Sequence, residues 1–133
     1  MRRHGAISVL FAVAAVYDGI LGLAFAVLPR LVFETCGVTP PNHFGYVRFP
    51  GLLLLVFAAL FAAVARAPRE NRNLIPYGAG LKASYCALVF WYWATSDIPW
   101  MWKPFAIVDL VFLALFVVAY RRLGSLAGEP PRP

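Results

Sequence analysis

The chain has 133 residues, of which 62% are hydrophobic and 14% are charged, and its formal net charge is +6. A soluble domain is nearer to roughly half apolar and a quarter charged, and a protein this small has too much surface for its volume to hide so much apolar material. The composition therefore excludes an ordinary soluble domain and indicates an all-α polytopic membrane protein. The arginines flank apolar runs and form no stripe, so no nucleic-acid partner is expected.

Four apolar segments are expected to form a four-transmembrane-helix bundle within one domain, residues 1–122, with helices at about 5–28, 50–66, 74–95 and 103–121. A spanning helix needs about 20 residues. Backbone groups in hydrocarbon must be satisfied internally, which leaves helices or closed barrels, and apolar runs such as residues 52–57 lack the alternation of barrel strands. Residues 123–133, rich in Gly and Pro, are expected to form a flexible cytoplasmic tail.

The first segment has some features of a signal peptide, because Arg2 and Arg3 precede it and Ala24-Phe25-Ala26 resembles a cleavage site. Its apolar stretch is longer than the roughly 7–15 residues of a typical signal-peptide core, and it contains Asp18. We therefore interpret it as a retained span.

The first connection, residues 29–49, is the longest, and residues 30–36 are expected to form a short interfacial helix before Pro40-Pro41. Glu34, Cys36 and His43 are potential metal ligands here, but their spacing matches no known site pattern, so no metal is expected. Cys36 falls in this connection and Cys86 inside a helix, so no disulfide between them is expected, and without a CxxC pair no dithiol chemistry is expected either.

Basic residues and tryptophans predict the orientation of the bundle. Eight arginines lie before the first helix, in the second connection or after the last helix, against two arginines and one lysine in the other two connections. Because positively charged connections stay inside, both termini are expected in the cytoplasm. Four tryptophans are expected to mark the outer interface as a headgroup-level belt: Trp91, Trp93, Trp100 and Trp102.

Three ionisable residues lie inside the expected spans: Asp18, Lys82 and Asp109. Each costs about 2.5–3.5 kcal/mol at a helix centre on insertion scales, so they are expected to face inward and pair. We predict that they form one cluster across the first, third and fourth helices, which then share the core. Two acids and one lysine leave a net charge of −1, so either a proton is held there or a hydroxyl of Tyr17 or Tyr85 helps.

The second helix has no polar residue in its core, and its Ala58/Ala62 and Ala59/Ala63 pairs suit close helix contact, either within the bundle or between protomers. It is expected to be the helix that remains free to meet lipid, a second copy of the chain or a membrane-complex partner.

Several short runs in the first half of the chain resemble the DoxX-like small four-helix membrane proteins of bacteria. The run Arg48-Phe49-Pro50-Gly51-Leu52-Leu53-Leu54-Leu55 opens the second helix, and Gly19-Ile20-Leu21-Gly22, Leu28-Pro29 and Cys36-Gly37-Val38 precede it. The resemblance implies a multi-pass protein of the bacterial inner membrane. The family takes its name from a membrane subunit of a thiosulfate:quinone oxidoreductase, but the buried charges are not part of the resemblance.

The leading hypothesis is a non-enzymatic membrane protein whose buried cluster binds a small ligand or a proton, as a transporter or accessory subunit. It rests on the general rule that intramembrane charges are functional; a purely structural ion pair is the competing interpretation. The candidate residues are Asp18, Lys82, Asp109, Tyr85 and Tyr17, with no catalytic residue, metal or cofactor. The alternatives are a redox subunit handling a quinone-like lipid and an assembly partner.

Overall fold

The structure, a computed structural model, describes residues 5–127. These residues contain no β-strand, which confirms the all-α prediction. They form five α-helices and one 3-10 turn: α1 (Gly5–Val27), α2 (Pro29–Cys36), α3 (Gly45–Arg66), η2 (Arg72–Leu74), α4 (Ile75–Thr95) and α5 (Trp102–Ala127). Residues 128–133 of the expected tail, and Arg2, Arg3 and Arg132, lie outside the described part of the chain.

Three of the described helices, α1, α3 and α5, are long and apolar enough to cross a membrane. Helix α4 has a suitable length, 21 residues, but it carries Lys82 and Ser84 together with five tyrosines and tryptophans, so it is less apolar. The short helix expected over residues 30–36 is confirmed as α2, which begins at Pro29, where the missing N–H of proline costs nothing.

Two helices are longer than the sequence predicted. Helix α3 begins at Gly45, five residues before its expected start, and holds Pro50 inside its first turns. This extension brings Arg48 to the end of α1, where its Nη1 donates to the Ala26 carbonyl at 2.7 Å and satisfies an oxygen that the helix end leaves free. Helix α5 continues to Ala127, past the expected start of a flexible tail at residue 123.

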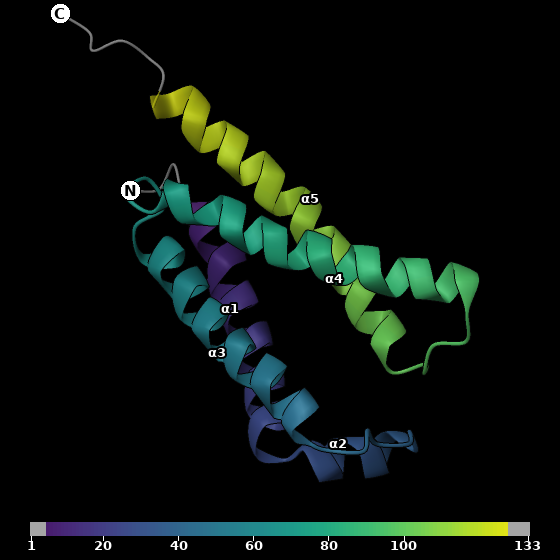
Figure 1. The fold of residues 1–133 in the computed structure, drawn as a ribbon. Helices are drawn as coiled ribbons and strands as arrows, with labels where there is room; N and C mark the ends of the chain where they lie inside the picture. Colours follow the sequence, from purple (N-terminus) through teal and green to yellow (C-terminus); the bar gives the residue numbers. More distant parts are fainter. Residues whose placement is uncertain (1–4, 128–133) are drawn as a thin grey trace, which may run out of the picture.

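The four long helices form two pairs, α1 with α3 and α4 with α5 (Figure 1). The pairs lie close together at the end where α3 leads into α4. They diverge toward the other end, where α2 and the connection from α4 to α5 lie. The backbones of the two pairs are therefore farther apart at one end of the bundle than at the other.

The contact between α1 and α3 is close because glycine faces glycine. A Cβ added at Gly22 would lie 2.7 Å from the Gly51 carbonyl oxygen, and one added at Gly51 would lie 2.7 Å from the Ala26 nitrogen. Small residues let helix backbones approach in this way. Because α3 packs along α1 and also buries Phe61 and Val64 completely, the prediction that the second span stays outside the shared core is wrong.

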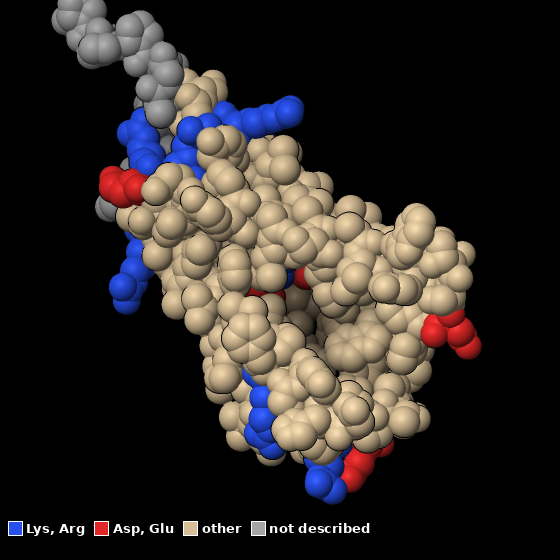
Figure 2. Space-filling view, viewed as in Figure 1, with Lys and Arg blue, Asp and Glu red and all other residues tan. Residues whose placement is uncertain are grey.

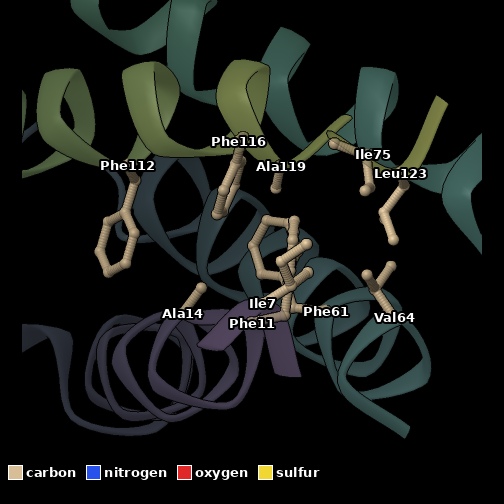
Figure 3. Packing of buried hydrophobic residues seen from close by; sticks show 10 residues of the cluster. All are labelled: Ile7, Phe11, Ala14, Phe61, Val64, Ile75, Phe112, Phe116, Ala119 and Leu123. Atoms are coloured by element: carbon tan, nitrogen blue, oxygen red, sulfur yellow. The ribbon is translucent and has the colours of Figure 1, made fainter. Parts of the chain in front are cut away.

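An aromatic core fills the end of the bundle where the two pairs converge. Phe11 stacks on Phe116 with ring centroids 4.6 Å apart, and Phe61 packs against Phe116 at 5.2 Å. Figure 3 shows ten side chains of this core, contributed by α1, α3, α4 and α5: Ile7, Phe11, Ala14, Phe61, Val64, Ile75, Phe112, Phe116, Ala119 and Leu123. The core therefore uses all four long helices.

Candidate functional site

The three predicted charged residues meet in the interior of the bundle. Lys82 Nζ lies 2.9 Å from Asp18 Oδ1 and 3.0 Å from Asp109 Oδ1, so one ammonium group donates to both carboxylates. Asp18 and Lys82 are each 1% exposed and Asp109 is 7% exposed. The prediction of one cluster across these three helices is confirmed, and we call it the charge cluster.

Each member of the charge cluster lies within the buried stripe of its own helix. In α1 the buried positions include Ala14, Asp18 and Gly22, and in α4 they include Gly78 and Lys82. Residues three or four apart share one face of a helix. The backbone periodicity that buries the apolar neighbours therefore also buries the charges, and the small residues beside them leave room for the long lysine side chain.

Aromatic rings surround the ammonium group. The ring centroids of Tyr17, Phe61 and Phe112 lie 5.5, 5.7 and 5.2 Å from Lys82 Nζ, within the range of cation–π attraction. Phe61 comes from α3, the helix that sequence reasoning left out of the site. Its spacing of four from Phe57 would have indicated an inward-facing aromatic stripe.

Neither tyrosine hydroxyl donates to the carboxylates, so of the two alternatives the structure shows no tyrosine donor and a proton held by the cluster remains open. The Tyr85 hydroxyl donates to the Trp102 carbonyl oxygen at 2.9 Å. The Tyr17 hydroxyl is buried without a partner among the described residues, and so is Asp18 Oδ2. The charge cluster thus holds two carboxyl groups for one lysine, and Asp18 Oδ2 has no donor among the described residues.

A cavity of about 660 Å³ lies between the two helix pairs and ends at Asp18 and Asp109. Figure 2 shows it as a hollow in the uncharged middle of the molecule, with red and blue atoms visible inside. Its wall is mainly apolar and comes from all four long helices and the first connection, with Leu21, Phe25, Gly51, Leu54, Tyr85, Leu88, Trp102 and Phe105 among its residues. The divergence of the helix pairs therefore produces a pocket above the charge cluster.

The bundle is closed on the other side of the charge cluster. The aromatic core fills that end. Arg72 of η2 also binds to α5 there: its Nε donates to the Tyr120 carbonyl at 2.9 Å, and its guanidinium lies 3.7 Å from the centroid of the Tyr120 ring. None of the ten buried side chains of that core lines the cavity. The pocket is therefore blind at the charge cluster.

The tryptophans divide into two groups. Trp91 and Trp100 are largely exposed and Trp93 is 42% exposed. Trp102, in contrast, stacks on Phe25 with centroids 5.7 Å apart and lines the cavity. Trp102 is thus part of the candidate site, a role that the predicted interfacial belt did not anticipate.

The first connection holds one local hydrogen bond and one to the connection between α4 and α5. His43 Nδ1 accepts a hydrogen bond from the Gly45 N–H at 2.9 Å, and the Cys36 carbonyl accepts one from Trp100 Nε1 at 3.1 Å. Among residues 5–127, no three His, Cys, Asp or Glu side chains are grouped to hold a metal ion.

Comparisons of the chain with protein-family models, curated proteins and solved structures found no match.

Proposed function

We propose that this protein is a four-span protein of the bacterial inner membrane, with both termini cytoplasmic, that binds a small ligand in the cavity above the charge cluster. One observation carries the binding proposal: an apolar cavity of about 660 Å³ ends at two carboxylates that share a single lysine. Small-molecule sites are commonly apolar cavities of about 300–1,000 Å³ with a few convergent polar groups.

The packing of Lys82 supports α4 as the fourth span. Of the residues of α4, Lys82 would cost the most free energy if its side chain faced lipid. In the structure it is 1% exposed and paired with Asp18 and Asp109. A charge that is neutralised inside a bundle does not have to face hydrocarbon. The arginine asymmetry and the resemblance to DoxX-like proteins support the same topology, with the aromatic core on the cytoplasmic side and the cavity on the outer side.

The redox alternative has less support from the site. A quinone headgroup accepts hydrogen bonds through its carbonyl oxygens, so it needs donors in its pocket. Lys82 already donates to both carboxylates, and the Tyr85 hydroxyl donates to a backbone carbonyl. Lys82 does not line the cavity and the hydroxyl of Tyr85, which does, is engaged, so a binding protein or transporter is the better interpretation.

Native mass spectrometry of protein released gently from membranes tests the binding proposal. Leu54 lines the cavity, so Leu54→Trp fills it, whereas Val56, on the same helix, is 63% exposed and does not line it. We expect a small-molecule adduct on the wild type and on Val56→Trp, and its loss in Leu54→Trp. An adduct that persists in Leu54→Trp, or no adduct on the wild type, contradicts the proposal; a copurifying protein instead favours an assembly role.

A further inference from the structure

We propose that the ligand is a membrane-soluble monocation, an ammonium group on an apolar body, that enters the cavity sideways from the bilayer between α3 and α4. This inference rests on the proposed function and adds the chemical class of the ligand and its route. It joins three independent features of the cavity: the charge at its floor, the chemistry of its wall and the position of its mouth.

The floor of the cavity requires a donor. Both Oδ1 atoms accept from Lys82, whereas Asp18 Oδ2 is buried without any hydrogen-bond partner among the described residues. A buried acceptor without a partner is costly, and an ionised one more so. A ligand that brings N–H groups and one positive charge to this floor supplies the donor and the charge that a second carboxyl group calls for, whereas an anion or a pure acceptor would supply neither.

Asp109 is the carboxylate best placed to meet such a group. Its side chain is 10% exposed, against 1% for Asp18, and both residues line the cavity. The low dielectric of the site strengthens an ammonium–carboxylate contact relative to the same contact in water. We therefore expect the ligand's ammonium group to bind first at Asp109 and to contribute most of the preference for a cation.

The wall of the cavity fits the rest of such a ligand. Phe25, Trp102 and Phe105 present aromatic rings, which attract cations as well as apolar groups. Leu21, Leu54 and Leu88 supply aliphatic surface. A single carboxylate pair at the floor beneath an apolar wall matches a molecule that is charged at one end and apolar along its length.

The mouth of the cavity lies where lipid is expected. Leu53 of α3 and Leu88 of α4 line the cavity and are 39% and 57% exposed, so the two helices leave a gap between apolar side chains on the outer surface of the bundle. Figure 2 shows the hollow within the tan band that separates the charged groups at the two ends. A ligand dissolved in the bilayer therefore reaches the mouth without crossing either charged end.

Photolabelling tests this inference in nanodiscs of zwitterionic phosphatidylcholine. Two probes carry the same tetradecyl chain with a diazirine at its middle; one ends in a primary amine and the other in a hydroxyl. Labelled residues are mapped by peptide mass spectrometry, with an excess of unlabelled tetradecylamine as competitor. We expect the amine to label cavity residues of α3 and α4 at least about tenfold more than the alcohol, as a buried charge-assisted hydrogen bond predicts.

Three variants localise the effect. Asp109→Asn should reduce the preference for the amine to within about twofold, because the amide removes the negative charge but keeps the shape. Leu54→Trp should abolish labelling of the cavity by both probes, and Val56→Trp should label as the wild type does. If Asp109→Asn does not fold, the comparison of the two probes on the wild type still decides the question.

The outcomes separate this inference from the proposed function. Equal labelling of the wild-type cavity by amine and alcohol, lost in Leu54→Trp, overturns the monocation and leaves a ligand-binding cavity in place; a proton held by the carboxylates would then account for the charge imbalance. Labelling of residues only outside the cavity overturns the lateral route. Absence of cavity labelling by either probe, together with no adduct in native mass spectrometry, overturns both proposals.

Discussion

Lys82 Nζ lies 2.9 Å from Asp18 Oδ1, although the two residues are 64 positions apart in the chain. The ion pair connects α1 to α4 and therefore connects the two helix pairs at the level where they begin to diverge. Below it the aromatic core holds the pairs together, and above it the cavity separates them. The charge cluster is thus the floor of the candidate site, and on the far side of the cavity Phe25 of α1 stacks on Trp102 of α5 and connects the pairs again.

Removal of the lysine charge should destabilise the bundle strongly. In Lys82→Met two buried carboxylates lose their shared partner, and breaking a buried ion pair from one side costs about 3–5 kcal/mol. The free energy of unfolding, measured by denaturation in mixed micelles, should fall by that amount. Arg69→Gln, which removes an exposed positive charge, should change it by less than about 0.5 kcal/mol.

The neutral triple variant Asp18→Asn/Lys82→Met/Asp109→Asn should recover part of that loss. No uncompensated charge is buried in it, and replacing a whole buried ion pair is often close to neutral. The same denaturation experiment measures it. A triple variant less stable than Lys82→Met would mean that desolvation of charge is not what makes the lysine necessary.

The crossing of α1 and α3 should be sensitive to a single methyl group. A Cβ at Gly51 would lie 2.7 Å from the Ala26 nitrogen, and backbone cannot move aside as a side chain can. We expect Gly51→Ala to lower the free energy of unfolding by about 1–3 kcal/mol. At Gly19 the added Cβ would lie 3.8 Å from Ala58 Cβ, an ordinary contact, so Gly19→Ala should be neutral or slightly stabilising. Equal effects would show that the two helices are not so close in the membrane.

The contact of α4 with the aromatic core gives a second matched pair. A Cβ at Gly78 would collide with the ring of Phe61, and this ring is completely buried among other core side chains. A Cβ at Gly80 would meet nothing within 4 Å. Gly78→Ala should therefore lower the melting temperature by several degrees, since about 1 kcal/mol shifts the midpoint by roughly 4 °C in a domain of this size. Gly80→Ala should leave it unchanged or raise it; the reverse order would contradict the packing.

Cysteine accessibility tests the fourth span. Arg69 and Asp97 are exposed residues on either side of α4. In a chain with Cys36 and Cys86 replaced by alanine, Asp97→Cys should react with a membrane-impermeant maleimide in spheroplasts, and Arg69→Cys only after lysis. Labelling of both positions from the same side would mean that α4 does not cross the membrane and that the proposed topology is wrong.

Much of the fold follows from local physics. An apolar run of spanning length must be helical in lipid whatever its neighbours are, so both ends of α1 and α4 and the start of α5 could be located to within one residue. The meeting of Asp18, Lys82 and Asp109 was also predictable, because the cost of an unpaired charge in hydrocarbon leaves few alternatives. These conclusions depend on the composition of single segments and on a large energy penalty.

Only the tertiary structure decided how the helices pair and where space remains. The place of α3 depends on the close approach of Gly22 and Gly51, which is a relation between two surfaces and leaves no periodic signal in either sequence. The cavity depends on the divergence of the two helix pairs, and no segment encodes that by itself. The sequence by itself therefore determined that three charges must be buried together. The packing decided that Phe61 joins them, that Tyr17 and Tyr85 do not donate to them, and that a cavity opens above them.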